Sequence, residues 1–295
     1  MTWFWLVGGG LRLFVVGSDG FVGTAICAKS RLKDSIVRVA HGSAESSVPL
    51  DLREPDNFDY SMLSGDCAVV FLAAISSPDF CSADPGNAGE INVKGTRAFI
   101  EKALARDCRV IFFSSDVVFG NCTGIVDEDT PKSPLGVYGE MKAEVETRFS
   151  GLANFKVVRP SYIVSVKDKF SSYLRGCALA QRTAEVFHPL LRSGIHIDDV
   201  IAAIDNLLLN WHRHPCPSVN LCGTRLVSRI DLAEILKRAL GLELDVKVVE
   251  APPGFYASRP PVIEMKSLHL ESLLGRLPLD LEVALKGEIE WEQKK

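Results

Sequence analysis

Two hydrophobic periods alternate along the first half of the chain and predict strands and helices in turn. Residues 67–74 form a continuous apolar run, as expected of a central parallel strand covered on both faces. Residues 21–32 instead sort their apolar side chains onto the faces of a helix. This half predicts strands at 11–16, 36–40, 48–50, 67–74, 109–113 and 156–159, and helices at 21–32, 88–105 and 138–149.

Strict alternation of strands and helices predicts an α/β fold, a doubly wound parallel (Rossmann) sheet with right-handed crossovers. The second half is less regular. It predicts helices at 198–210 and 228–240, short strands at 219–221 and 246–249, and two final helices. Ser228-x-x-Asp231 is a capping box for the second helix, and Gly241 fits its end. We expect a dinucleotide-binding domain at 11–160. Residues 161–295 then form mainly a smaller α+β substrate-binding lobe, with some segments returning to the sheet.

Composition and charge narrow the classes of partner. The 295 residues carry a formal net charge of −4, which gives no basic field for a nucleic acid, whereas a small anionic ligand can still bind at a helix end. The 8 cysteines form no Cys-x-x-Cys pair and no zinc-ligand cluster with histidine, so we expect reduced thiols, no metal and a cytoplasmic protein. The apolar residues 1–7 are too short to span a bilayer and lack the basic start of a signal peptide.

A glycine turn follows the first strand and opens the first helix. Its spacing is Gly17-x-x-Gly20-x-x-Gly23. The first glycine allows a tight turn, the second lets backbone approach a pyrophosphate, and the third lets helix and strand pack closely. The N-terminus of the helix adds N–H groups and a positive dipole end. The context of strand, turn and helix predicts a bound NAD(P) dinucleotide.

The choice between NADH and NADPH is left open, with a preference for NADPH. The second strand ends in the residues 39–43, Val-Ala-His-Gly-Ser, with no carboxylate to hold the two ribose hydroxyls of NAD. No arginine stands at that turn to bind a 2′-phosphate either. Asp51 and Leu52, after the third strand, are candidate contacts on the adenine side.

Tyr138 and Lys142 lie four residues apart, on one face of a predicted helix. A tyrosine titrates near pKa ~10, and a nearby ammonium together with an oxidised nicotinamide favours its phenolate. Tyr138 could then act as a general acid or base near neutral pH. Ser115 follows the predicted strand 109–113, and the carboxyl ends of such strands line the ligand crevice. Its hydroxyl is placed to bind the oxygen that Tyr138 protonates.

Through these motifs, residues 11–285 resemble the extended short-chain dehydrogenase/reductase family. The resemblance also rests on Ala73-Ala74, Asn92-Val-x-Gly95-Thr96, Ser114-Ser115-Asp116-x-Val118-Phe119, Arg159-Pro160-Ser161 and His196-Ile-Asp198-Asp199-Val200. It implies Ser115, Tyr138 and Lys142 as the catalytic triad. The cofactor-binding residues that follow are Gly17, Asp19, Gly20, Phe21, Val22, Gly23, Asp51, Leu52, Leu72, Ala73, Ala74, Ser114, Tyr138, Lys142 and Pro160.

Within that family the chain looks most like the dTDP-4-dehydrorhamnose reductase subgroup. Residues 257–260, Ala-Ser-Arg-Pro, match a segment of that subgroup, which implies that Arg259 contacts a sugar-nucleotide diphosphate. Val117 stands where the reductases often carry tyrosine, and Tyr162 where they carry tryptophan. Val117 also argues against a 4,6-dehydratase, which needs a glutamate there. The implied substrate-binding residues are Ser76, Asp116, Val117, Tyr162 and Arg259.

Three functions follow from these observations. The first is an NAD(P)-dependent 4-keto-sugar reductase that acts on a nucleotide-activated sugar. The second is a sugar-nucleotide epimerase with tightly held NAD, because the His196 motif is more typical of epimerases. The third is a non-catalytic regulatory subunit of the same fold. The analogy with the family implies a homodimer, a nucleotide-sugar substrate and no membrane partner.

Overall fold

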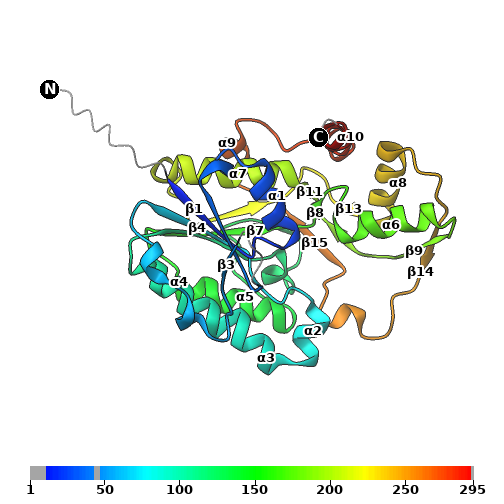
Figure 1. The fold of residues 1–295 in the computed structure, drawn as a ribbon. Helices are drawn as coiled ribbons and strands as arrows, with labels where there is room; N and C mark the ends of the chain where they lie inside the picture. The colour runs from blue at the N-terminus through cyan, green and yellow to red at the C-terminus, as the bar shows by residue number, and fades with distance from the viewer. Residues whose placement is uncertain (1–10, 43–46, 294–295) are drawn as a thin grey trace.

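The computed structural model describes residues 11–42 and 47–293, so the first ten residues and Ser43 lie outside the described part of the chain. A seven-stranded sheet forms its centre, and each pairing in it is parallel. The strand order is β12-β7-β5-β4-β1-β2-β3, which confirms the predicted doubly wound sheet (Figure 1). The strands are β1 (Arg12–Val16), β2 (Ile36–Ala40), β3 (Val48–Pro49), β4 (Cys67–Phe71), β5 (Arg109–Phe113), β7 (Phe155–Pro160) and β12 (Ser218–Leu221).

Helices cover both faces of this sheet, because successive side chains of a strand point to opposite faces. Leu13 and Val15 pack with α1, α7 and α9, whereas Phe14 and Val16 pack with α4 and α5. Figure 1 shows these two helical layers above and below the sheet. Their bounds are α1 (Phe21–Lys29), α4 (Thr96–Leu104), α5 (Gly136–Arg148), α7 (Ile197–Leu209) and α9 (Leu270–Leu274).

A second lobe lies to one side of the sheet, on the right in Figure 1. Leu174, Leu236 and Leu285 are buried in its own apolar cluster. Its helices are α6 (Lys169–Leu179), α8 (Arg229–Leu240) and α10 (Leu281–Gln293), and its strand pair is β9 (Ala184–Phe187) with β14 (Val246–Val249). The remaining strands form two smaller sheets. One has the order β13 (Val227–Ser228), β10 (Leu191–Arg192), β15 (Val262–Met265) and β6 (Ile125–Val126), and the other pairs β11 (Ile195–His196) with β8 (Ile163–Val164). Helices α2 (Pro78–Ala83) and α3 (Pro85–Gly89) follow β4 along the chain.

Helix α10 joins the two lobes through one buried carboxylate. Glu288 accepts hydrogen bonds from the Ser165 hydroxyl at 2.8 Å and the Val166 backbone N–H at 2.9 Å. It also contacts His196 Nε2 at 3.2 Å and the ammonium of Lys29 on α1 at 3.7 Å. Because His196 Nδ1 accepts the N–H of Asp198, Nε2 carries the ring proton and donates it to Glu288.

Several sequence expectations need correction. The strand expected at 67–74 ends at Phe71, because the Ala73 N–H turns back to the carbonyl of Val16. The helix expected at 88–105 is instead α3, a π-helical turn at Glu90–Gly95 and then α4. Helix α6 was not predicted, although Asp168 caps it by accepting the N–H groups of residues 170 and 171. The capping box at Ser228 and the left-handed end at Gly241, with a φ of +61°, are confirmed.

Candidate active site

The turn between β1 and α1 requires glycine because a side chain would collide with backbone. Gly17 has a φ of +88°, in the left-handed region, and a Cβ on it would lie 2.8 Å from the nitrogen of Ala73. A Cβ on Gly23 would lie 2.2 Å from the carbonyl oxygen of Gly17. The start of α1 is therefore held against the end of β1, an arrangement that suits an anionic diphosphate.

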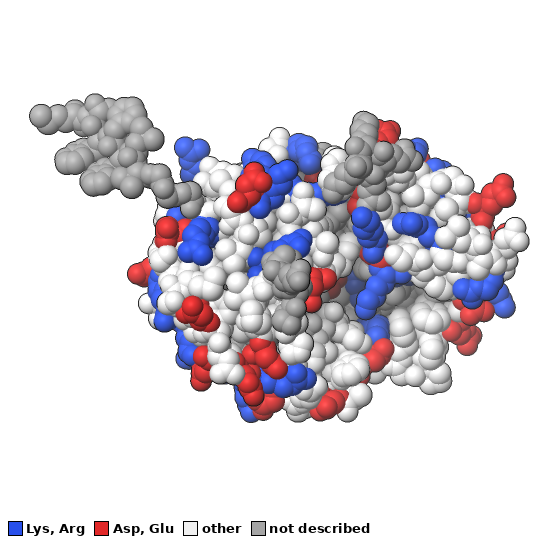
Figure 2. All heavy atoms as spheres, in the orientation of Figure 1, with Lys and Arg blue, Asp and Glu red and all other residues white. Residues whose placement is uncertain are grey.

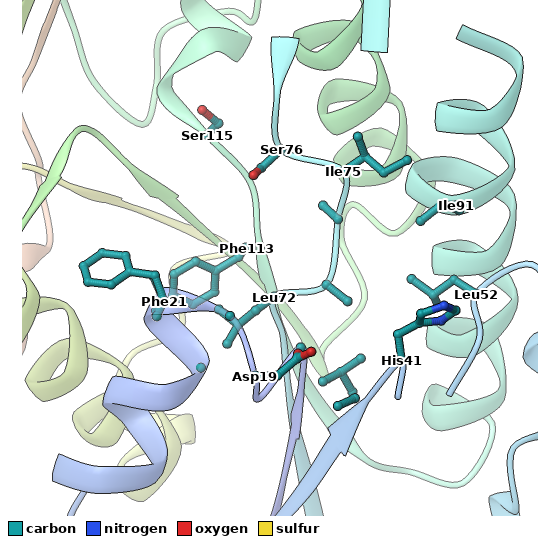
Figure 3. A pocket seen from close by; sticks show the side chains of 18 of the residues that line it. Asp19, Phe21, His41, Leu52, Leu72, Ile75, Ser76, Ile91, Phe113 and Ser115 are labelled. Carbon is teal, nitrogen blue, oxygen red and sulfur yellow. The ribbon is translucent and has the colours of Figure 1, made fainter. Parts of the chain in front are cut away.

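A cavity of about 950 Å³ opens beside this turn, at the carboxyl ends of the strands. In Figure 3, Asp19 and Phe21 from the glycine turn, Leu72 and Ser76 from the segment after β4, and Ser115 after β5 surround one space. All the predicted cofactor-binding residues line it: Gly17, Asp19, Gly20, Phe21, Val22, Gly23, Asp51, Leu52, Leu72, Ala73, Ala74, Ser114, Tyr138, Lys142 and Pro160. The three predicted catalytic residues also line it, as do Ser76 and Tyr162. Their roles stay predictions.

Charged side chains meet at the end of the cavity beyond β2. The carboxylate of Asp51 accepts the backbone N–H of Arg53 at 2.8 Å and lies 3.8 Å from its guanidinium. His41 Nδ1 lies 3.9 Å from the same carboxylate. Arg53 also donates to the side chain of Asn87 at 3.1 Å. The sequence predicted no arginine at this end; β3 brings Arg53 here from further along the chain.

The motif at 92–96 shapes the cavity wall. The Asn92 side chain accepts the N–H of Ile75 at 2.8 Å and donates to its carbonyl at 2.9 Å, which fixes the segment after β4. A Cβ on Gly95 would lie 1.8 Å from the carbonyl oxygen of Leu52. The π-helical turn therefore packs against the segment that carries Leu52 into the cavity.

Tyr138 and Lys142 lie on α5 and face the end of β5. Lys142 is buried and donates to the carbonyl of Phe113 at 2.7 Å, with its ammonium 5.7 Å from the centre of the Tyr138 ring. Burial lowers the pKa of Lys142 to about 8, against the opposing charge of Glu146. Burial also raises the pKa of Tyr138, and Cys81 and Asp116 raise it further. The protein residues alone thus shift the Tyr138 pKa opposite to the predicted direction.

Ser115 lines the cavity, whereas the next residue does not. The Ser115 hydroxyl donates to the carboxylate of Asp116 at 3.1 Å. Asp116 is buried, lies 3.2 Å from the Nε of Arg192, and accepts the hydroxyl of Ser161 at 3.3 Å. Burial raises the pKa of Asp116, while the charge of Arg192 acts to lower it. In this structure the Asp116 carboxylate is turned into the protein, toward Ser115 and Arg192, and its contact with a substrate stays a prediction.

Two other predicted substrate residues lie away from the cavity wall. Val117 packs against the apolar cluster that contains Val118 and Phe119. Arg259 forms two hydrogen bonds of 2.5 Å to the carboxylate of Asp79 on α2, and its guanidinium stacks on the Phe255 ring at 4.8 Å. In this structure Asp79 occupies the binding face of Arg259, so the predicted diphosphate contact requires Arg259 to exchange partners.

Sequence reasoning missed residues at the start of the second lobe. Lys167, Asp168 and Lys169 line the cavity beside Tyr162, which donates to Asp168 at 2.5 Å. Burial raises the pKa of Tyr162. The helix-capping pattern of Asp168 was the signal that could have found this segment. Besides His41 and Arg53, the other missed lining residues are Val16, Val39, Ala40, Leu50, Ile75, Phe80, Asn87, Ile91, Phe113, Ser161 and Ile163.

The site fits a dinucleotide on observations of its own. Gly17 and Gly23 let the start of α1 pack against the end of β1 with no side chain between them, and the cavity runs from this turn to Tyr138. The hydroxyl of Ser114 is buried, lines the cavity and has no hydrogen-bond partner in the described part of the chain. A buried unpartnered hydroxyl is rare, and a bound polar group would satisfy it.

Residues 11–42 and 47–293 contain neither a metal-binding cluster nor a membrane-spanning helix. The cysteines are free thiols, and no group of three or more His, Cys, Asp or Glu side chains there could hold a metal ion. The helices in that part are too short or too polar to cross a membrane.

Comparison with known proteins shows the family of the chain and supports its fold. A family model described as the RmlD substrate binding domain matches residues 11–289. A curated dTDP-4-dehydrorhamnose reductase of Mycolicibacterium smegmatis is 25% identical over 202 residues, 65% of this chain and 59% of that protein. The chain spans between 52% and 64% of the length of the curated relatives it matches.

Solved structures resemble the chain over nearly its full length. A hypothetical dTDP-4-dehydrorhamnose reductase from Sulfolobus tokodaii has a TM-score of 0.78 at 22% identity, covering 92% of this chain and 98% of that one. A UDP-glucuronic acid 4-epimerase from Bacillus cereus, in complex with UDP-glucuronic acid and NAD, has a TM-score of 0.74 at 20% identity, covering 96% and 99%. At these identities the likeness establishes the fold.

Proposed function

Because this chain belongs to the RmlD substrate binding domain family, we propose that it is an NAD(P)-dependent reductase of a 4-keto group on a nucleotide-activated sugar. One observation carries the proposal. Ser115, Tyr138 and Lys142 line one cavity that begins at the glycine turn of Gly17 and Gly23. A proton donor and a dinucleotide site thus share the same space.

The chain's own residues handle the oxygen of the substrate. NAD(P)H, when bound, supplies the hydride. Tyr138 donates its phenolic proton to the carbonyl oxygen as negative charge develops there, and a raised pKa keeps that proton in place until it is needed. The ammonium of Lys142, held by the Phe113 carbonyl, stabilises the phenolate left behind. Ser115 turns its proton from Asp116 to the carbonyl oxygen and holds that oxygen in reach of Tyr138.

Positive charge near the second lobe supports an anionic substrate. Lys167 and Lys169 line the main cavity. Figure 2 shows lysine and arginine side chains gathered around the hollow between the lobes. A second cavity of about 390 Å³ lies beyond Tyr162 and is lined by Arg229 and aromatic rings, among them Phe170, Tyr173, Phe187 and Phe255. The Arg229 guanidinium stacks 4.0 Å from the Tyr162 ring, and its buried Nη1 has no partner in the described residues. A cation among aromatic rings suits a nucleoside diphosphate.

The adenosine end supports NADPH as the preferred cofactor. Arg53 and His41 bring positive charge to the wall beyond β2. A guanidinium binds a 2′-phosphate in a charge-assisted, two-pronged contact. Asp51, already paired with Arg53, is the carboxylate of this wall that would otherwise favour NADH.

Steady-state NADPH oxidation tests the proposal. We expect turnover when a dTDP- or UDP-4-keto-6-deoxy sugar is added. Tyr138→Phe should lower kcat by at least ~100-fold, because it removes the proton donor, while NADPH affinity measured by calorimetry changes little. Absence of NADPH oxidation with every keto-sugar nucleotide of a broad panel would refute the reductase.

A second candidate, an epimerase with tightly held NAD, is favoured by one contact. The Ser115 hydroxyl gives its proton to Asp116 and so offers a lone pair to its ligand. That arrangement suits a substrate alcohol, the group from which an epimerase starts. Denaturing the purified protein and assaying the released nucleotide separates the two functions, because stoichiometric NAD⁺ is expected only of the epimerase.

A further inference from the structure

A buried ion pair stands directly behind Ser115. The Arg192 side chain is 12% exposed and that of Asp116 is 9% exposed, and they meet at 3.2 Å. The Ser115 hydroxyl donates to the free oxygen of this carboxylate, and the Val117 N–H reaches the Ser115 oxygen at 3.4 Å. The hydroxyl is therefore oriented from two sides, and one of these contacts depends on the ion pair.

Arg192 also joins this pair to a distant segment. Its Nη2 donates to the carbonyl of Pro260 at 2.8 Å. Pro260 packs so closely on the segment after Ser115 that a Cβ on Gly120 would lie 2.9 Å from it. Two residues before Tyr138, a Cβ on Gly136 would lie 3.1 Å from the backbone of Ser258. Residues 258–260 thus contact both segments that present the proposed catalytic groups.

A contribution to the stability of the fold does not by itself explain a buried ion pair at this position. Removing two charges from water costs several kcal/mol each, and apolar replacements of buried pairs are often as stable as the pair. What an apolar pair could not supply is the acceptor for the Ser115 hydroxyl. The contact with Ser115 therefore accounts for a carboxylate at this position.

We infer that Asp116 and Arg192 are positioning residues: Asp116 orients the Ser115 hydroxyl, and Arg192 fixes Asp116 while linking it to Pro260. The orientation of Ser115 then depends on residues 258–260 being docked against the strand ends. This inference rests on the proposed function, in which Ser115 binds the reacting oxygen of the substrate.

A double-mutant cycle tests the link to Ser115. Asp116→Asn should lower kcat by on the order of 10- to 100-fold, since a small misplacement of a catalytic group has effects of that size. KM for NADPH should stay within about twofold. In a Ser115→Ala background, Asp116→Asn should change kcat by less than about twofold. If the kcat losses of the two single variants multiply in full in the double variant, the inference is overturned.

A matched pair elsewhere controls for the loss of a buried charge. Asp199 is fully buried on α7, accepts Arg276 at 2.6 Å and does not line the cavity. Asp199→Asn should lower the melting temperature as Asp116→Asn does, yet leave kcat within about twofold. An equal kcat loss in both variants would assign the effect to general destabilisation and overturn the inference.

The arginine is tested by graded replacement. Arg192→Lys keeps a charge beside Asp116 and should retain more kcat than Arg192→Met, which should fall to the level of Asp116→Asn. If Asp116→Asn does not fold, the double variant Asp116→Asn/Arg192→Met removes both buried charges and serves in its place. Full kcat in Arg192→Met would overturn the role of the arginine.

A structural measurement separates this inference from the proposed function. A wild-type protein without turnover on any nucleotide sugar would refute the function. Crystal structures of the wild type and of Asp116→Asn then still test the positioning. We expect the Ser115 hydroxyl to leave its place in the variant; an unchanged Ser115 side chain would overturn the inference even in an active enzyme.

Discussion

Replacing Glu288 by glutamine should destabilise the protein by about 3 kcal/mol at neutral pH. The carboxylate is 4% exposed and contacts Ser165, Val166 and His196. Burial acts to raise the pKa of Glu288, but hydrogen bonds from His196, the Val166 N–H and Ser165 outweigh it and lower the pKa from 4.5 to about 2. Glutamine keeps the shape of the glutamate side chain, but its amide N–H group would face one of these hydrogen-bond donors.

The magnitude follows from the two pKa values. A difference of about 2.5 corresponds to about 3 kcal/mol, at ~1.36 kcal/mol per pKa unit. Because the pKa of Glu288 is lower in the folded state, this stabilisation is fully present above pH 4.5 and is lost as the pH falls toward 2. Near pH ~3.3 about half of this stabilisation should be left.

Urea unfolding of the wild type and Glu288→Gln at pH 7 and at low pH measures this difference. At pH 7 the variant should also melt lower by roughly 6–12 °C, at ~2–4 °C per kcal/mol for a chain of this size. Glu290→Gln, an exposed position on the same helix, should stay within about 0.5 kcal/mol. A Glu288→Gln loss below about 1 kcal/mol, or one that does not shrink in acid, would refute the reasoning.

The remaining predictions concern the cavity. Gly23→Ala should weaken NADPH binding by about 100-fold in calorimetry, because its Cβ would displace Gly17; Gly20→Ala, whose Cβ would lie 3.4 Å from the same oxygen, should change it by less than about 10-fold. Equal losses would contradict this account. Arg53→Ala should weaken NADPH by at least ~10-fold and leave NADH within about twofold, whereas parallel losses would argue against a 2′-phosphate contact. Because the pKa of Lys142 is about 8, kcat should fall as the pH rises through 8, and Lys142→Arg should not show that limb in a profile from pH 6 to 10.

Local patterns predicted much of this molecule. The order of strands and helices follows from hydrophobic periods that each segment carries by itself, and the parallel sheet follows from that order. The glycine turn and the Tyr138–Lys142 spacing were equally readable, because a helix places residues four apart on one face. Parallel strands bring their carboxyl ends together, so Ser115 could also be assigned to the crevice.

Contacts between distant segments could not be predicted in the same way. Asp116 was assigned to the substrate on the resemblance to the reductase subgroup, but its carboxylate contacts Ser115 and Arg192. Its partner Arg192 lies on β10, in another part of the chain. Arg259 was expected to bind a diphosphate. It instead forms two hydrogen bonds with Asp79, which lies 180 residues away in the sequence. Neither pairing leaves a local signal in the sequence.

The strand order has a practical consequence for the design of truncated fragments of this protein. A fragment that stops at Pro160 would lack β12, so β7 would become an open edge with unpaired backbone groups. The same fragment would lack α7 and α9, which cover Leu13 and Val15. Such a fragment would expose both an unpaired strand edge and an uncovered apolar face of the sheet, so it should aggregate on expression. Reporter fusions and chimeras therefore belong at the ends of the chain, not at the apparent border between the lobes.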